Sequence, residues 1–249
     1  MQHFEIDKDT LKQLAAFTRE AALETLWPTR CVICDYPGDL LCESCRKKLS
    51  YIDPWSACEH CGAPFGLIQC SECNPAVTTG LGDVTFCASG AVSALIYDAQ
   101  TKRIISAYKD KGERRLSTTM AEIMASYTKP LWRNNAYGIA FIPSSVQARR
   151  MRGFDHAELL AQELGKCLDL PCIAIFHEPK SHDQRKLSRK DRLTNLEGRI
   201  SLLPGASPPK HLILIDDVCT TGATLSAATN ALHKGGCKDV WCLTFARAW

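Results

Sequence analysis

Hydrophobic residues follow two kinds of pattern along this chain. Short continuous apolar runs, typical of strands buried on both faces of a parallel sheet, lie at 91–97, 136–143, 173–176, 212–215 and 240–245. Apolar residues spaced three to four positions apart, which indicate helices, lie in 98–109, 114–127, 155–168 and the stretch that ends at 234. Because strands and helices alternate, the sequence predicts an α/β fold with a parallel sheet flanked by helices.

Another helical pattern precedes these elements. Between residues 8 and 27 the apolar positions share one face, and Asp9 or Thr10 is a candidate N-cap. Basic residues are sparse there, so we expect this helix to dock on the rest of the fold rather than on a membrane. No apolar run approaches the roughly 18 residues of a membrane-spanning helix, and the N-terminus is charged throughout. We therefore expect a cytoplasmic protein without a membrane span.

Fourteen cysteines change this picture, because eight of them are crowded into the first third of the chain. Where thiols stay reduced, clustered cysteines indicate metal binding rather than disulfides. A CxxC turn presents two thiolates to one tetrahedral ion, so four such pairs predict two structural Zn²⁺ sites. The candidate ligands are Cys31, Cys34, Cys42, Cys45, Cys58, Cys61, Cys70 and Cys73.

Two pairings of the four CxxC pairs are open at this point. The short gaps favour the sequential form, in which the first two pairs share one ion and the last two share the other. The alternative is an interleaved form, which joins the first pair with the third and the second with the fourth. His60 is expected to be a surface residue, because the cysteines already fill both sites. Small buried apolar residues are the expected role of Cys167, Cys172, Cys237 and Cys242.

These patterns divide the chain into three predicted regions. Residues 1–28 form an N-terminal helix, 29–80 form a double zinc ribbon, and 91–249 form the α/β domain. The segment 74–90 contains Gly and Thr without clear periodicity and is expected to be a linker.

The stretch 211–226, HLILIDDVCTTGATLS, holds the most specific pattern in the chain. A buried strand is followed by two adjacent carboxylates, Asp216 and Asp217, and then by a hydroxyl-rich loop that opens a helix. Free backbone N–H groups and the helix dipole make such a loop a good anion site. The carboxylates need a different partner, and ribose hydroxyls or Mg²⁺ would satisfy them. No GxxxxGK[ST] sequence occurs, so this is not a Walker A loop.

A second polar segment, Pro143-Ser144-Ser145, also follows a predicted strand directly. The carboxyl ends of parallel strands meet at one edge of the sheet, so we expect this segment to lie near 216–224. The net charge of +3 is mild, so local basic clusters carry more information than the whole-molecule field. Arginine binds phosphate oxygens bidentately, and Arg152 is the best candidate. The full set is Lys109, Arg149, Arg150, Arg152, Arg185 and Arg192.

The 211–226 stretch resembles the loop that binds phosphoribosyl pyrophosphate (PRPP) in the type I phosphoribosyltransferases. The resemblance implies that the two acids hold the ribose hydroxyls and that the loop wraps the 5′-phosphate. It implies a pyrophosphate loop after Ile142 and a catalytic loop at 177–200. The implied PRPP-binding residues are Asp216, Asp217, Val218, Cys219, Thr220, Thr221, Gly222, Ala223 and Thr224. Those implied for pyrophosphate are Lys109, Pro143, Ser144, Ser145, Arg149, Arg152 and Arg192. The Cys219 thiol is expected to be incidental rather than catalytic.

Four blocks narrow the resemblance to the ComF (ComFC/GntX-like) family. They are YDAQTKRIISAYKDKG at 97–112, IPSSVQARRMRGFDHAELLAQELG at 142–165, QRKLSRKDRLTNLEG at 184–198, and the PRPP loop. The cysteine region is similar to the double zinc ribbon of that family.

The chain departs from the family pattern in two places. The family usually has Asn-Gln after RGF, and this chain has Asp155-His156. An Arg and a Thr are common where Pro179 and Ser181 stand here, so the role of that Arg is in doubt, with Lys180 as a stand-in.

The resemblance implies Mg²⁺-dependent transfer of a phosphoribosyl group from PRPP to a nitrogen acceptor, and a link to DNA uptake and natural transformation. Two alternatives stay open. One is a PRPP or nucleotide sensor without turnover, and the other is an accessory factor that binds single-stranded DNA or a helicase-like partner. No C-terminal hood follows the last predicted strand, so we expect acceptor selection to come from residues 1 to about 90.

Overall fold

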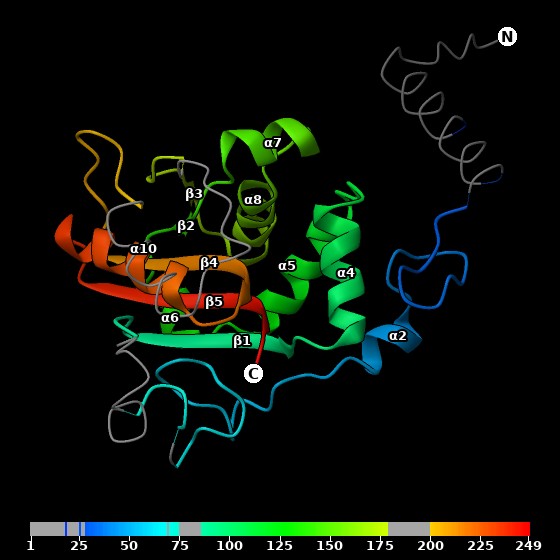
Figure 1. The fold of residues 1–249 in the computed structure, drawn as a ribbon, viewed down its shortest axis with the longest axis horizontal. Helices are drawn as coiled ribbons and strands as arrows, with labels where there is room; N and C mark the ends of the chain where they lie inside the picture. Colours follow the sequence, from blue (N-terminus) through cyan, green and yellow to red (C-terminus); the bar gives the residue numbers. More distant parts are fainter. Residues whose placement is uncertain (1–17, 19–24, 26–27, 69, 75–85, 179–199) are drawn as a thin grey trace, which may run out of the picture. The chain divides into compact units, whose positions relative to one another are not determined.

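The computed structural model describes residues 18, 25, 28–68, 70–74, 86–178 and 200–249. The chain divides into two compact units, residues 1–48 and 49–249, and each is described by itself (Figure 1). Nearly all of the predicted helix at 8–27, most of the predicted linker and the whole 184–198 block lie outside the described residues. The domain boundaries stay predictions, but the second half of the cysteine-rich region belongs to the same compact unit as the sheet.

The smaller unit holds the first four of the clustered cysteines. Its short helix α2 (Glu43–Lys47) begins directly after Cys42 and buries Cys45. Ahead of it, Arg30 and Pro37 form an antiparallel bridge around the turn that carries the first CxxC pair. The two CxxC pairs of this unit are therefore presented by a turn and by a helix start.

Five parallel strands form the centre of the larger unit (Figure 1). They are β1 (Gly90–Ile96), β2 (Ile139–Phe141), β3 (Cys172–Ile173), β4 (His211–Cys219) and β5 (Asp239–Arg247). Their order in the sheet is β1-β5-β4-β2-β3, and every pairing is parallel. The predicted fold class, a parallel sheet flanked by helices, is confirmed.

Strand β4 shows why the apolar runs predicted buried strands. All four residues 212–215 are 1% exposed or less. Leu212 and Leu214 pack in one core cluster with Leu225 and Leu232 of the helix that follows. Because strand side chains alternate between faces, Ile213 and Ile215 point to the opposite face. The sheet is therefore covered on both sides.

Six helices surround the sheet in the described part of this unit, and their starts follow local rules. Asp98 caps the first of them by accepting hydrogen bonds from Gln100 N and Thr101 N, both at 2.9 Å. Pro130 occupies the first turn of another, where its missing N–H costs nothing. The helices are α4 (Ala99–Lys109), α5 (Leu116–Tyr127), α6 (Pro130–Asn135), α7 (Val146–Arg152), α8 (His156–Leu168) and α10 (Ala223–Lys234).

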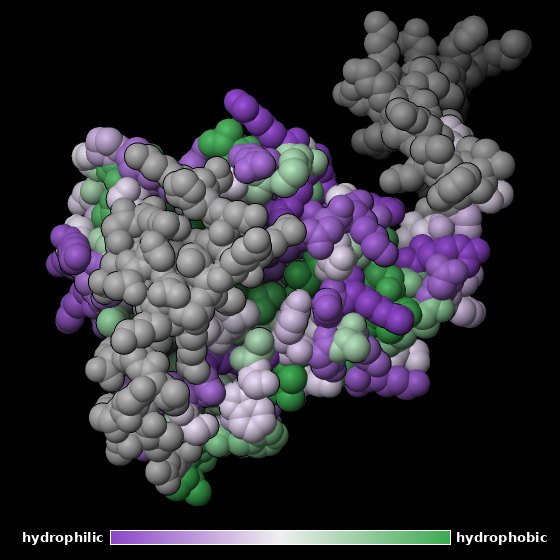
Figure 2. Space-filling model, viewed as in Figure 1, coloured by the Kyte–Doolittle hydropathy of each residue, from purple (hydrophilic) through white to green (hydrophobic). Residues whose placement is uncertain are grey.

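Two of these helices were not predicted. Helix α6 has six residues, too few for a periodic pattern to stand out. Helix α7 has seven residues and buries none of them, so it carries no apolar stripe. Figure 2 shows hydrophilic and hydrophobic surface mixed where α7 lies, and Val146 and Met151 of this helix are exposed. None of the helices in the described ranges is long and apolar enough to cross a membrane.

Strand β4 is also longer than its apolar run. The sequence placed Asp216 and Asp217 after the strand, but both lie within it, and Asp216 is paired with Thr244 of β5. The pairing continues to Cys219, opposite Arg247. The ladder extends because β5 supplies a partner along the whole length of β4, which a single apolar run cannot reveal.

Candidate functional site

The clustered cysteines form two sets of four. In the first cysteine set (Cys31, Cys34, Cys42, Cys45) and the second cysteine set (Cys58, Cys61, Cys70, Cys73), the sulfur atoms lie within 4.8 Å of one another. Neighbouring sulfurs are 3.7 Å apart in the first set and 3.5 and 3.6 Å apart in the second. A tetrahedral ion with Zn–S bonds of about 2.3 Å needs sulfurs roughly 3.8 Å apart, so both sets fit Zn²⁺. The arrangement is the sequential pairing, and His60 belongs to neither set.

The two acids of β4 stand at the carboxyl edge of the sheet beside Lys109, the last residue of α4. Lys109 Nζ lies 2.5 Å from Asp217 Oδ2, and the Asp217 side chain is only 4% exposed. Asp216 Oδ1 accepts a hydrogen bond from Asp217 N at 2.8 Å. Burial raises the pKa of Asp217, but Lys109, His156 and the hydrogen bond with Asp216 together outweigh it, and the net shift is downward. Burial and the neighbouring Asp217 charge raise the pKa of Asp216. The pair therefore favours one negative charge balanced by Lys109.

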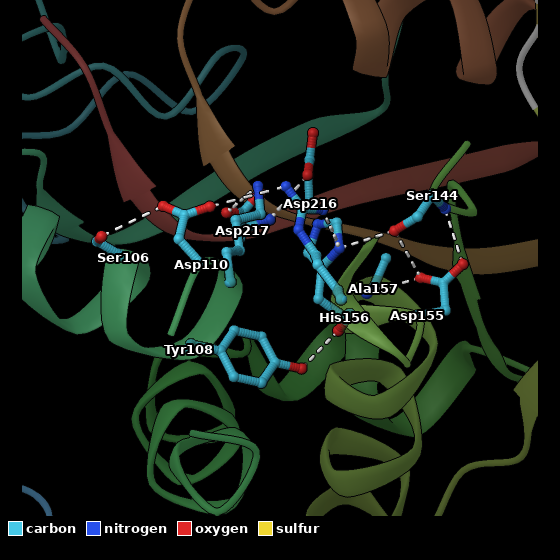
Figure 3. Close-up of polar contacts among 11 residues, drawn as sticks. Ser106, Tyr108, Asp110, Ser144, Asp155, His156, Ala157, Asp216 and Asp217 are labelled. Carbon is cyan, nitrogen blue, oxygen red and sulfur yellow. Dashed lines mark hydrogen bonds and ion pairs between the residues drawn. The ribbon is translucent and has the colours of Figure 1, made fainter. Parts of the chain in front are cut away.

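A second polar network lies beside these acids and holds the second strand-end loop (Figure 3). Ser144 N donates to Asp155 Oδ2 at 2.7 Å, and Ser144 Oγ donates to Asp155 Oδ1 at 3.0 Å. Asp155 is also the N-cap of α8, since Oδ1 accepts from Ala157 N at 3.0 Å. One carboxylate thus fixes both the loop after β2 and the start of α8.

His156, the first residue of α8, stands at the centre of this network. Its Nδ1 lies 2.7 Å from Ser144 Oγ and 3.3 Å from Arg152 NH1, and its carbonyl accepts from the Tyr108 hydroxyl at 2.6 Å. Burial, followed by the charges of Lys109 and Arg152, lowers the pKa of His156 to about 4. The imidazole is therefore neutral at neutral pH and adds no charge to a site that already holds two cations.

The three arginines of helix α7 do not all point the same way. Arg152 is half-buried and points toward His156, with Asp110 Oδ1 3.9 Å from its NH2. Arg149 is paired with Glu178, and Arg150 is exposed. Gly153 ends the helix at φ 74°, which a side chain rarely adopts, and its carbonyl accepts from Arg114 NH2 at 2.9 Å. The structure thus brings Arg152, and not its neighbours, to His156.

The hydroxyl loop (residues 220–224) joins β4 to α10. Thr221 Oγ1 accepts a hydrogen bond from Ala223 N at 3.4 Å. The N-cap of this 12-residue helix is Gly222, which has no side chain and therefore cannot cap the helix start. Gly222 has φ 75°, and a Cβ there would lie 3.0 Å from the ring of Phe86. Within the part of the chain that the structure describes, the N-cap of α10 thus donates no side-chain cap, and the helix start keeps the positive end that an anion site needs.

The two predicted strand-end loops meet at one edge of the sheet. Phe141 and Ile215 are register partners on adjacent strands, so the Ser144 loop and the acids are neighbours as expected. Arg192 and Arg185 lie outside the described residues. In the sequence, Asp155-His156 stands out only as a departure from the family pattern. The sequence does hold a signal for Asp155: it is a polar residue directly before a helical stretch, which is the usual N-cap position.

The parallel sheet and the two sets of four cysteines define the class of protein: an α/β protein with a zinc-ribbon region. A family model described as a double zinc ribbon domain matches residues 22–80. The chain is 27% identical to Competence protein F of Haemophilus influenzae, over 88% of this chain and 97% of the relative. It is 28% identical to Competence protein ComFC of Bacillus subtilis, over 85% and 86%. These relatives confirm the ComF family resemblance.

Solved structures of similar fold include an orotate phosphoribosyltransferase from Aeropyrum pernix, 14% identical, with a TM-score of 0.36 over 64% of this chain and 82% of that one. A hypoxanthine phosphoribosyltransferase from Staphylococcus aureus, 15% identical, has a TM-score of 0.32 over 53% and 62%. Similarity at this level supports no argument about the site, which rests on the geometry of this chain.

Proposed function

We propose that the protein binds PRPP, or a related 5-phosphoribosyl compound, at the carboxyl edge of β4. The observation that carries this proposal is the position of Asp216 and Asp217 on the strand that leads directly into the hydroxyl loop and α10. An acid pair accepts hydrogen bonds from ribose hydroxyls, and the helix start accepts a phosphate. The end of this one strand can therefore bind both the hydroxyls and the phosphate of a phosphorylated ribose.

The pyrophosphate of this ligand would lie over the Ser144 loop. Lys109 and Arg152 approach the same point from α4 and α7, and neutral His156 lies between them. These cations would stabilise the negative charge that develops on the leaving pyrophosphate. Electrostatic stabilisation contributes most where charge develops in the transition state. Because Lys109 is paired with Asp217, ligand binding would replace that pair with contacts to hydroxyls and phosphate.

The reaction we propose is transfer to a nitrogen acceptor. The C1′–O bond to pyrophosphate breaks with its electron pair on oxygen, the acceptor nitrogen forms a C1′–N bond, and the nitrogen loses its proton to solvent. The acid pair orients the ribose for this displacement. Carboxylate oxygens suit Mg²⁺, and Asp216 and Asp217 would hold that ion, which neutralises the pyrophosphate charge when bound.

Calorimetry with PRPP and with ribose 5-phosphate, each with MgCl₂, tests the binding site. We expect wild-type protein to bind both ligands, and Asp217→Asn to lose at least about tenfold in affinity. Asp239→Asn is the matched control, because Asp239 pairs with His211 at 2.8 Å at the opposite end of the same two strands. Wild-type protein that binds neither ligand would overturn the proposal.

The biological process we propose is DNA uptake, since relatives of this chain are named competence proteins and one that is 31% identical over 110 residues is named DNA utilization protein YhgH. We place the protein in the cytoplasm, where the ligand thiols stay reduced. Release of pyrophosphate on addition of candidate bases separates an enzyme from a sensor. A salt-dependent anisotropy change with labelled single-stranded DNA tests the accessory-factor alternative.

A further inference from the structure

Arg247 is an almost fully buried cation that no part of the proposed reaction uses. It is the last residue of β5, is 2% exposed, and lies opposite Cys219 of β4 and Ile96 of β1. Moving a guanidinium out of water costs several kcal/mol unless negative charge and hydrogen bonds compensate. The contacts of Arg247 therefore indicate which negative charge its buried guanidinium compensates.

One side of the guanidinium faces the hydroxyl loop. Arg247 NH1 donates to Cys219 Sγ, and Cys219 is the last strand residue before Thr220. The same sulfur would lie 3.8 Å from a Cβ at Gly222, so it packs beneath the loop. Burial raises the pKa of the Cys219 thiol, although Arg247 opposes that shift. A neutral thiol accepts a hydrogen bond from Arg247 but supplies no counter-charge.

The other side of the guanidinium faces the second cysteine set. Arg247 NH2 lies 3.8 Å from Oε2 of Glu72, which stands between Cys70 and Cys73. Glu72 N in turn donates to Cys70 Sγ at 3.4 Å, so the carboxylate that faces Arg247 belongs to a residue bonded to the second cysteine set. Within the described residues Arg247 Nε is buried without a hydrogen-bond partner. Figure 1 shows the segment that carries this set alongside β1, in the same compact unit.

Four thiolates around one Zn²⁺ carry a net charge of minus two. A buried cation beside them offsets part of that charge, and the zinc–thiolate centre gives the cation the counter-charge that one carboxylate at 3.8 Å does not fully supply. Backbone contacts reinforce this junction: Ala91 N donates to Glu59 O at 3.1 Å, and Ala248 N donates to Cys219 O at 2.9 Å.

We propose that Arg247 is a positioning residue that couples zinc in the second cysteine set to the conformation of the hydroxyl loop. With zinc bound, the guanidinium is held between Glu72 and Cys219 and fixes the loop at its strand end. Without zinc, Arg247 loses its counter-charge and the loop loses its anchor. This inference rests on the proposed function only for its consequence, that zinc in the second set strengthens binding of a 5-phosphoribosyl ligand.

Hydrogen exchange of two amides that hold the loop tests the coupling, measured on the full chain with and without zinc in the second set: Ser226 N, which donates to Gly222 O at 2.8 Å, and Ala248 N, which donates to Cys219 O at 2.9 Å. We expect zinc removal to speed exchange in wild-type protein by about tenfold or more. In Arg247→Gln the loop should exchange fast whether or not zinc is bound, and zinc transfer to a chromogenic chelator should show about tenfold weaker binding. Arg133→Gln, an exposed arginine on α6, should behave as wild type.

Two further variants keep the test decisive. Arg247→Lys retains the charge but not the fork, so it should hold zinc normally while the loop exchanges fast. If Arg247→Gln does not fold, Cys219→Ala removes the acceptor of the guanidinium and should make loop exchange fast and insensitive to zinc, with zinc affinity unchanged. Loop exchange that ignores zinc in wild-type protein overturns the inference. Failure of the proposed function is distinct, because the wild type would then not bind ribose 5-phosphate even with zinc loaded.

Discussion

Lys109 Nζ and Asp217 Oδ2 form a 2.5 Å ion pair in which the carboxylate is almost fully buried. Removing one partner leaves an uncompensated charge in a medium of low dielectric constant, which costs more than the pair itself contributes. We expect Lys109→Met to destabilise the protein by roughly 2–4 kcal/mol in urea unfolding. Lys102→Met, on the exposed face of the same helix, should cost little.

The double variant Lys109→Met/Asp217→Asn checks the reason for that loss. If the penalty comes from the stranded carboxylate, the double variant should be more stable than Lys109→Met, with a coupling energy above about 1 kcal/mol. Additive effects of the two changes would contradict a direct interaction. Both single variants should bind ribose 5-phosphate more weakly than wild type.

His156 makes the stability of the folded protein depend on pH in the acid range. Its pKa is lowered to about 4, whereas an unfolded histidine titrates near 6.5. Above pH 6.5 neither state binds the proton, so the residue has no effect there. Between pH 6.5 and 4 only the unfolded chain takes it up, so stability falls, by roughly 3 kcal/mol in total. The groups that hold the ring neutral are Lys109 and Arg152, partly opposed by Asp217 and Asp155.

Unfolding free energies measured from pH 7 to 4 check this. His156→Gln should lose less stability than wild type across the window, even if it is less stable at pH 7. His177→Gln is the matched control, because His177 is exposed, and it should follow the wild-type curve. Parallel curves for wild type and His156→Gln would show that His156 takes up its proton in the folded protein.

Gly222→Ala is expected to damage the hydroxyl loop twice. Its φ of 75° costs an alanine about 1 kcal/mol, and the new methyl group would meet Phe86 at 3.0 Å. Gly112→Ala isolates the first cost, because Gly112 has φ 74° and nothing within 4 Å of a Cβ. Gly222→Ala should therefore be the less stable of the two, and it alone should weaken ribose 5-phosphate binding. Phe86→Leu in the Gly222→Ala background should restore part of the affinity.

The two cysteine sets should behave differently when they are disrupted. Metal analysis should find two zinc ions per chain, and one in either Cys34→Ala or Cys61→Ala. The second set belongs to the compact unit that holds the sheet and the first does not. Cys61→Ala should thus lower the unfolding temperature of the sheet, while Cys34→Ala leaves it near the wild-type value. Equal effects would mean that the sheet does not distinguish the two sets.

The sequence predicted those features that local patterns encode. The order of the strands and of the four longer helices, the four CxxC pairs and the shared edge of the two strand-end loops all follow from spacing and periodicity. Asp98 and Asp155 show that helix starts are local as well, since each caps its helix from one position before it.

Features that depend on partners distant in the chain were not predictable. Strand β4 includes Asp216 and Asp217 because β5 pairs with it, and no nearby residue announces that pairing. Phe86 sits beneath Gly222 across more than a hundred positions. The same applies to Arg247, whose partners Glu72 and Cys219 lie in separate regions of the sequence. The partners of such side chains can be identified only once the strands of the sheet are paired.

The order of strands in the sheet has a consequence for how the protein folds. Strand β1 pairs only with β5 among the described strands, and β5 lies between β1 and β4. Ser93 and Thr244, whose buried hydroxyls are 2.7 Å apart, are 151 positions apart in the chain. Such distant pairings are slow to form because a long loop must close first. Insertion of β5 is therefore the step that completes the sheet. Since Arg247 arrives with it, a nascent or partly folded chain should neither retain its second metal ion firmly nor present a finished ligand loop.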